Sequence, residues 1–285
     1  MTDPSPRLRT RFAPSPTGLL HLGHAHAALL AWRQAKETGG EFLLRIEDID
    51  SGRCRPEFES AIKEDLAWLG LTWREPVRRQ SDHMADYQAA LERLLALGLL
   101  YPCFCTRRDI AEEIARSAAA PQGPDGPLYP GLCRTMSKEQ RAVRKMRGIP
   151  FALRLDVRKA MKLTGPLQWQ DRRFGDFTAT PDIHGDAVLA RKDVTTSYHL
   201  SVVVDDGLQG VTLVTRGEDL LPATHLHRLL QALLGLPTPD YHHHGLLTDE
   251  SGRRLAKRDD ARSLRSLREA GHSAADLRAL AGFAD

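Results

Sequence analysis

The sequence lacks the features of three classes of protein: disulfide scaffolds, membrane proteins and generic polyanion binders. Only four of its 285 residues are cysteine, which argues against a fold held together by disulfides. No apolar run is long enough to cross a bilayer, and residues 1–7 lack the apolar core of a signal peptide. The net charge is only +3. We therefore expect a cytoplasmic protein that makes no membrane contact and is long enough for more than one domain.

The positive charge is unevenly distributed along the chain. Residues 134–159 hold nine Lys and Arg side chains against Glu139 and Asp156. Such a segment could contact nucleic-acid phosphates, or it could form the solvated surface of a helix. Its composition alone favours neither interpretation.

The segment 11–24, Arg-Phe-Ala-Pro-Ser-Pro-Thr-Gly-Leu-Leu-His-Leu-Gly-His, joins a strand expected at 8–12 to a helix expected at 25–36. Its prolines and glycines indicate a loop that runs into the start of a helix. Free N–H groups and the positive end of the helix dipole attract anions at such a point. The tetrad His21-Leu-Gly-His24 therefore suggests a nucleotide phosphate packed against the backbone.

Charged side chains follow two further expected strands, at 41–46 and 211–215. A strand, a helix and a strand with a tight first turn form a right-handed βαβ unit, so we expect an α/β fold with a parallel sheet. Ligands of such sheets bind at the carboxyl ends of the strands. Glu47 could hold a cationic amino group there, or it could cap the next helix. Arg216 carries a planar guanidinium that suits a carboxylate or a phosphate.

Three of the four cysteines, Cys103, Cys105 and Cys133, lie within 31 residues around a loop rich in Ala, Pro and Gly. Cys-x-Cys followed by a third cysteine suggests one structural zinc ion. Tyr129 could complete the tetrahedron as a phenolate, because a metal lowers the pKa of a coordinated group. Cys54 is a competing fourth ligand, and three reduced thiols without a metal are the simpler alternative.

Two polar segments lie near the C-terminus. Residues 241–244 contain three consecutive histidines, but neighbouring residues of a strand point to opposite faces, so we do not expect a metal site there. Residues 249–258 combine a turn with a basic cluster, in which Lys257 could stabilise charge that develops on phosphates. We expect His225 and His227 to be surface or packing residues of a helix.

Five motifs, taken in order, resemble the catalytic core of class I glutamyl-tRNA synthetases. They are the segment 11–24, Arg-Ile-Glu-Asp-Ile-Asp at 45–50, Val-Val-Val-Asp-Asp at 202–206, Arg-Gly-Glu-Asp-Leu at 216–220 and Arg-Leu-Ala-Lys-Arg at 254–258. The resemblance covers most of residues 8–260, and five motifs in sequence are far more specific than any one of them. It implies a class I aminoacyl-tRNA synthetase-type Rossmann domain with a zinc-containing insertion and a short C-terminal helical piece.

The family reaction has two steps. The glutamate carboxylate attacks the α-phosphorus of ATP, which acts with Mg²⁺, and the glutamyl group then passes from the adenylate to a hydroxyl of tRNA. By resemblance, the ATP-binding residues are His21, Gly23, His24 and Lys257, of which the two histidines and the lysine are catalytic. The glutamate-binding residues are Arg11, Ala13, Ser15, Glu47, Tyr198 and Arg216. Glu47 would take the α-amino group and the arginines the carboxylates. In the 254–258 loop, only the central lysine follows the family pattern.

The sequence stops about 27 residues after this loop, where glutamyl-tRNA synthetases continue into an anticodon-binding domain. It resembles short members of the family that bind zinc through a Cys-x-Cys pair, a tyrosine and a third cysteine. The matching residues in this sequence are Cys103, Cys105, Tyr129 and Cys133. Such members activate glutamate without tRNA and attach it to the queuosine base at the wobble position of tRNA(Asp). We therefore expect a monomer whose partners are L-glutamate, ATP and tRNA(Asp) carrying queuosine, with residues 134–159 gripping the stem-loop.

The expected order is a first Rossmann half at 1–102, an acceptor-binding insertion at 103–180, a second Rossmann half at 181–244, and the lysine loop with a stem-contact piece at 245–285. No anticodon-binding domain is expected. Three alternatives stay open. One is a truncated synthetase that charges the 3′ end of tRNA(Glu), and another is a non-catalytic, zinc-containing tRNA-binding module. The third is an adenylate-forming nucleotidyltransferase of small-molecule metabolism.

Overall fold

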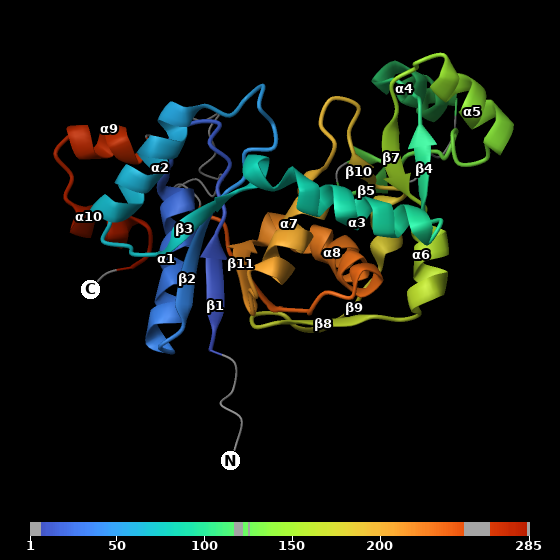
Figure 1. The fold of residues 1–285 in the computed structure, drawn as a ribbon. Coiled ribbons are helices and arrows are strands. Elements are labelled where there is room, and N and C mark those ends of the chain that lie inside the picture. Colours follow the sequence, from blue (N-terminus) through green and yellow to red (C-terminus); the bar gives the residue numbers. More distant parts are fainter. Residues whose placement is uncertain (1–6, 117–121, 125, 248–262, 284–285) are drawn as a thin grey trace.

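The computed structural model describes residues 7–116, 122–124, 126–247 and 263–283 (Figure 1). A parallel sheet forms its centre, with β1 (Arg9–Phe12), β2 (Glu41–Ile46) and β3 (Arg74–Arg79) in the order β1-β2-β3. Strands β11 (Leu213–Gly217) and β12 (Asp240–His244) form a second parallel pair. The Thr212 N–H donates to the Arg9 carbonyl at 2.9 Å, which places β11 beside β1 on the side away from β2.

This arrangement creates a switch point in strand order between β1 and β11. The chain passes from β1 through helix α1 (Leu22–Glu37) to β2 on one side, whereas β11 and β12 lie on the other. Crevices at such points bind the ligands of open α/β sheets. Helix α1 packs its alanine- and leucine-rich face, including Ala25, Ala28 and Leu29, into the core beneath this crevice.

Helices cover the sheet and connect its halves. Helix α2 (Pro56–Trp68) packs with α1, and α3 (Met84–Ala96) follows the short helix η1 (Gln80–His83). Helices α7 (Tyr198–Leu208) and α8 (Leu221–Leu234) pack with α3 in the larger core cluster. The Val-Val-Val-Asp-Asp motif at 202–206 therefore lies within a helix. The short helix η3 (Glu218–Leu220) links β11 to α8.

The insertion lies on the opposite side of the molecule from α1 and α2 (Figure 1). Its antiparallel sheet has the order β10-β7-β4, built from β4 (Leu100–Cys103), β7 (Ala152–Leu155) and β10 (Val188–Ala190). Its remaining described elements are α4 (Arg107–Arg116), the pair β5 (Gln122–Gly123) and β6 (Gly126–Pro127), α5 (Lys138–Met146), α6 (Val157–Thr164) and η2 (Pro181–His184).

Two pairings differ from the expected boundaries of 103–180 and 181–244. The hairpin of β8 (Gln168–Asp171) and β9 (Gly175–Thr178) joins the edge of β12, because its inward residues Trp169 and Asp171 are buried there. Trp169 packs with Tyr241 in a separate core cluster. Strand β10, in turn, pairs with β7 of the insertion. The insertion is thus interrupted by a hairpin that belongs to the central sheet.

The C-terminal residues form two short helices rather than one, α9 (Leu264–Glu269) and α10 (Ala274–Leu280). Gly271, with a φ of +94°, lies between them in a conformation that L side chains rarely adopt. Both helices bury leucines against α1 and α2 (Figure 1). Within the described residues, no helix combines the length and the apolar character that crossing a membrane requires.

Candidate active site

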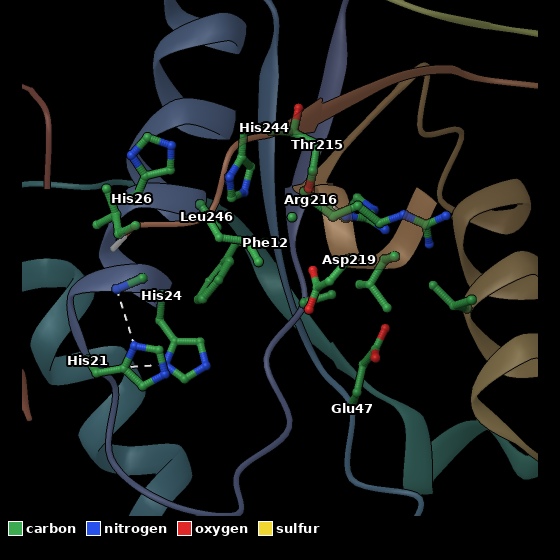
Figure 2. Close-up of a pocket in the computed structure, with 18 of the residues that line it drawn as sticks. Phe12, His21, His24, His26, Glu47, Thr215, Arg216, Asp219, His244 and Leu246 are labelled. Atoms are coloured by element: carbon green, nitrogen blue, oxygen red, sulfur yellow. Dashed lines mark hydrogen bonds between the residues drawn. The ribbon is translucent and has the colours of Figure 1, made fainter. Parts of the chain in front are cut away.

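A cavity of about 440 Å³ lies where the carboxyl ends of β1 and β11 meet the first turn of α1 (Figure 2). It brings together most of the residues expected to bind glutamate and ATP, namely Arg11, Ala13, His21, Gly23, His24, Glu47, Tyr198 and Arg216. Ser15 lines a smaller neighbouring pocket of about 130 Å³, whose wall also includes Glu47 and Tyr198. Lys257 lies outside the described residues.

The two histidines of the tetrad shape the start of α1. His21 is the N-cap residue, and its Nδ1 accepts the Gly23 N–H at 3.1 Å, while Nδ1 of His24 accepts the His21 N–H at 3.3 Å. A Cβ at Gly23 would lie 3.1 Å from the His21 ring, so glycine allows this close approach. The rings line the cavity beside the positive end of the helix, which is a favourable position for a phosphate (Figure 2).

A buried cluster of charges lies behind the Glu47 side of the cavity. The fully buried Arg45 contacts Glu47 at 3.1 Å and Asp206 at 2.8 Å. Arg11 also contacts Asp206, at 3.1 Å. Arg45 and Asp206 belong to motifs quoted from the sequence, but no local pattern predicts that they pair, because they are 161 residues apart. The pairing offsets the large cost of burying each charge alone.

Asp205, the neighbour of Asp206 on α7, serves a different set of partners. Its carboxylate accepts hydrogen bonds from Arg78 at 2.7 Å and Gln80 at 2.8 Å. The Tyr87 hydroxyl donates to it at 2.9 Å. Adjacent aspartates therefore fasten α7 to β1 and β2 on one side and to β3, η1 and α3 on the other.

Glu47 reaches the cavity from just beyond the end of β2 (Figure 2). Burial raises the pKa of its carboxyl, although the neighbouring cations Arg45 and Arg11 act in the opposite direction. Oε1 accepts a hydrogen bond from Arg45. A carboxylate at this position in a polar crevice can bind an ammonium group, as expected from its place after the strand.

Arg216 is 6 % exposed and has no carboxylate partner among the described residues. Its guanidinium donates instead to neutral groups, namely His243 Nε2, the Tyr198 hydroxyl, His227 Nδ1 and the Thr224 hydroxyl. A buried cation without a protein counter-ion favours an anionic ligand. Arg11 differs, because Asp206 already neutralises it.

His225 and His227 were both expected to be surface or packing residues, and the structure corrects this expectation for one of them. His225 packs against Trp169, as expected of a packing residue, but His227 contacts the guanidinium. Of the three histidines on β12, His243 points to Arg216, whereas His242 contacts Gln34. The alternation of a strand predicts that neighbours diverge, but only the fold shows that His243 contacts Arg216 and that His244 lines the cavity.

Cys103, Cys105 and Cys133 form a compact cluster with all sulfurs within 4.8 Å of one another. The Tyr129 hydroxyl lies 3.4 Å from the Cys103 sulfur and 3.6 Å from the Cys105 sulfur. Tetrahedral Zn–S bonds of about 2.3 Å and a Zn–O bond of about 2.0 Å give ligand separations of about 3.5–3.8 Å. These four groups therefore fit a zinc ion. Cys54 lies in the small pocket near Asp50 and is not part of the cluster.

Comparisons with known proteins agree with this arrangement. Residues 7–280 match the family described as class I tRNA synthetases (E and Q), catalytic domain. The chain is 53% identical to the glutamyl-Q tRNA(Asp) synthetase of Rhodobacter capsulatus, over 96% of this chain and 99% of that protein. It is 44% identical to the protein of the same name from Nocardia farcinica, over 95% and 82%. The glutamate–tRNA ligase of Aquifex aeolicus is 39% identical, over 93% and 54%.

Solved structures give the same grouping. A glutamate tRNA ligase from Elizabethkingia meningosepticum in complex with its amino acid has a TM-score of 0.76 and 31% identity, over 89% of this chain and 52% of that one. The chain thus spans about half the length of that ligase. Methionyl-tRNA synthetase from Mycobacterium tuberculosis, at 12% identity and a TM-score of 0.58, shares the fold. By sequence and by structure, the chain belongs to the class I glutamyl- and glutaminyl-tRNA synthetase family.

Proposed function

We propose that this protein activates L-glutamate with ATP and transfers it to the queuosine base at the wobble position of tRNA(Asp). The observation that carries the first step is the cavity that holds an unneutralised buried cation, Arg216, a carboxylate, Glu47, and a helix start suited to phosphate. The acceptor rests on the relatives named glutamyl-Q tRNA(Asp) synthetase, of which this chain covers 99% and 82% of the length. We also propose that the enzyme acts as a monomer in the cytoplasm.

In the proposed complex, Glu47 binds the α-ammonium group and Arg216 binds the side-chain carboxylate. Figure 2 shows Glu47 and Arg216 on one side of the cavity and His21 and His24 on the other. A glutamate held in this way directs its α-carboxylate towards the nucleotide. The carboxylate oxygen attacks the α-phosphorus of ATP, and pyrophosphate leaves with Mg²⁺. Lys257 would stabilise the charge on the phosphates, as its motif implies.

In the second step, a hydroxyl of queuosine attacks the carbonyl carbon of glutamyl-adenylate, and AMP leaves with the bonding electron pair. The protein need form no covalent bond itself, because positioning and charge stabilisation can supply the rate enhancement. Ala13 and Ser15 would complete the wall around the amino acid, and Gly23 would admit the phosphates close to the backbone.

Zinc would have a structural role in the insertion, held by the Cys103, Cys105 and Cys133 sulfurs and the Tyr129 oxygen. Basic residues contact two of these four residues. Arg141 donates to the Cys133 carbonyl at 3.2 Å, and the Arg154 guanidinium lies 3.9 Å from the centre of the Tyr129 ring. The exposed cations of α5 are then available for phosphates of the tRNA stem-loop. In this proposal, the insertion binds the acceptor and the C-terminal helices contact the stem.

Glutamate-dependent ATP–pyrophosphate exchange without tRNA tests the first step. Transfer of labelled glutamate is then compared among three substrates: tRNA(Asp) with queuosine, tRNA(Asp) with guanosine at the same position, and queuosine-containing tRNA(Asp) that lacks its 3′-terminal adenosine. We expect transfer to the first and third substrates only. Labelling of tRNA(Glu) that requires the terminal adenosine would instead identify a synthetase that charges the 3′ end. Absence of exchange would identify a binding module.

A further inference from the structure

We propose that His243 and His227 are positioning residues that hold Arg216 ready for a carboxylate and keep its charge unneutralised, an inference that rests on the proposed glutamate activation. Each imidazole contacts the guanidinium through a nitrogen that can only accept. The other nitrogen of each ring has its own partner, which is Asp171 for His243 and His199 for His227. This second contact determines which nitrogen carries the hydrogen. The pair would explain how the site selects an acid over the corresponding amide.

The guanidinium has five N–H groups, of which the described residues engage four. Nε donates to His243 Nε2 at 3.1 Å, and one terminal nitrogen donates to His227 Nδ1 and the Tyr198 hydroxyl, both at 3.2 Å. The other terminal nitrogen donates to the Thr224 hydroxyl at 2.7 Å. The fifth N–H has no partner among the described residues. It can donate to a ligand, because Arg216 lines the cavity.

The tautomer of His243 follows from Asp171. Arginine always donates, so Nε2 of His243 must be unprotonated and Nδ1 must carry the hydrogen. Nδ1 lies 2.7 Å from Asp171 Oδ2, which also accepts the His243 backbone N–H at 3.0 Å. The other carboxylate oxygen accepts the backbone N–H groups of Arg173 and Phe174. Asp171 is therefore fixed from both sides and can orient the ring.

His227 is held in the opposite tautomer by the same reasoning. Its Nδ1 accepts from Arg216, so Nε2 carries the hydrogen and donates to Nδ1 of His199 at 3.1 Å. Burial lowers the pKa of His243 to about 4, and burial together with the Arg216 charge holds the pKa of His227 well below its usual range. Both rings are therefore neutral acceptors at pH 7.

Neutral acceptors leave the positive charge of Arg216 unneutralised, whereas carboxylates would neutralise it. Asp206 contacts Arg11 directly and neutralises it, whereas the His243 ring separates Asp171 from Arg216. The orientation of Arg216 is thus fixed without a direct anionic contact from the described residues. A glutamate carboxylate becomes its direct counter-ion, while the neutral amide of glutamine cannot replace that charge.

The decisive variant is Asp171→Asn, which has nearly the same shape. Its amide would donate to Nδ1 of His243 and move the ring hydrogen to Nε2, against the Arg216 N–H, as a wrong tautomer does in a catalytic triad. We expect the KM for glutamate in ATP–pyrophosphate exchange to rise about 10- to 100-fold, the loss of a hydrogen bond to a charged group. The KM for ATP should stay unchanged, and discrimination against glutamine should fall.

A second pair of variants tests the other ring. His227→Leu should raise the KM for glutamate, and His227→Asn should restore it to within a few fold, because the Asn oxygen lies near the position of Nδ1. His242→Asn, on the same strand but directed at Gln34, is the matched control and should behave as wild type. If Asp171→Asn lowers the melting temperature, the proposal is tested by His227→Leu and His227→Asn alone.

The outcomes separate the two proposals. Absence of glutamate-dependent exchange in the wild-type protein overturns the proposed function itself. Normal exchange in wild type, combined with an unchanged glutamate KM in both Asp171→Asn and His227→Leu, overturns the positioning role. Equal rises in the KM values for glutamate and ATP, without rescue by His227→Asn, indicate general damage and also overturn it.

Discussion

Arg45 donates a hydrogen bond to Asp206 across 2.8 Å, and both side chains are buried beneath the Glu47 side of the cavity. Arg45 also contacts Glu47, so one cation balances carboxylates from α7 and from the end of β2. These charges are therefore paired before any ligand arrives, by side chains from elements that are far apart in sequence.

Replacement of Arg45 by Met should be severely destabilising. It leaves Glu47, Asp205 and Asp206 as buried carboxylates without their central cation, which costs about 3–5 kcal/mol for a broken buried pair. Urea unfolding at pH 7 measures the change in unfolding free energy. The exposed pair of Arg108 and Glu112 provides the control, since Arg108→Met should cost less than about 0.5 kcal/mol. Equal effects of the two variants would contradict the role assigned to burial.

Glu47→Gln should raise the KM for glutamate at least tenfold while leaving the KM for ATP near wild type, because an amide cannot pair with an ammonium group. The pKa of Glu47 is raised by burial, and the carboxyl must be ionised to bind the ligand. The glutamate KM of the wild type should therefore increase as the pH falls towards that raised pKa. The variant should lack this acid-side increase, and an identical pH profile for both proteins would contradict the assignment.

Asp65 is a carboxylate on α2 whose removal should stabilise the protein at neutral pH. It is 1 % exposed, neither oxygen has a hydrogen-bond partner among the described residues, and burial raises its pKa from 3.8 to about 6. The folded state thus binds the proton more tightly than the unfolded state, so stability falls as pH rises from about 4 to about 6. Nearby Arg265 and Arg268 pair with Glu64 instead.

Asp65→Asn should accordingly raise the unfolding free energy at pH 8 by about 1–3 kcal/mol. The gain should shrink as the pH is lowered through 6 towards 4, where the wild-type carboxyl is itself protonated. Denaturant titrations at pH 8 and pH 5 measure the difference. Glu57→Gln, on the exposed face of the same helix, should change little at either pH. A gain that does not depend on pH would point to a cause other than the buried charge.

The zinc site predicts a defined metal content. Purified wild-type protein should contain one zinc ion per chain, and Cys133→Ser should lose it and melt at a lower temperature, because structural zinc contributes to folding. Cys54→Ser should keep the metal and the stability of the wild type, since Cys54 lies outside the cluster. Elemental analysis and thermal melts distinguish these cases. A wild-type protein without zinc after metal-supplemented expression would refute the site.

Lys257→Ala should lower kcat for pyrophosphate exchange by about 10²–10³, as the loss of one charge-stabilising donor does in other enzymes. The KM for glutamate should stay within a few fold of wild type, because the role proposed for the lysine is to stabilise charge on the phosphates. Lys36→Ala, at the far end of α1, serves as the control. A kcat close to that of the wild type would remove Lys257 from the catalytic residues.

Local patterns in the sequence predicted much of the fold and the site. The Pro/Gly loop, the strand before Glu47 and the strand before Arg216 each have a local signature, and the sheet brings them to one cavity. The position of Asp171 had no such signature. It lies in a hairpin that interrupts the insertion in sequence but joins β12 in space, so pairing alone places it behind His243.

The difference between local patterns and long-range strand pairing also explains why the contacts of the histidines could not be predicted. The alternation of a strand predicts that His242 and His243 face opposite sides, but it does not say which face meets Arg216. That depends on the parallel pairing of β11 with β12, where Arg216 lies opposite His243. The partners of Arg45 on α7, Asp205 and Asp206, are 160 and 161 residues away, and no local pattern predicts such a pairing.

The packing of α9 and α10 against α1 also has a consequence for synthesis of the protein. Leu264, Leu267 and Leu277 belong to the same core cluster as Phe12 and Leu20, and the Leu264 N–H donates to the Leu20 carbonyl at 2.8 Å. On the ribosome, the first βαβ unit emerges long before these leucines do. The part of its apolar surface that these leucines cover must therefore remain exposed, or be shielded by a chaperone, until residues 264–277 have been translated.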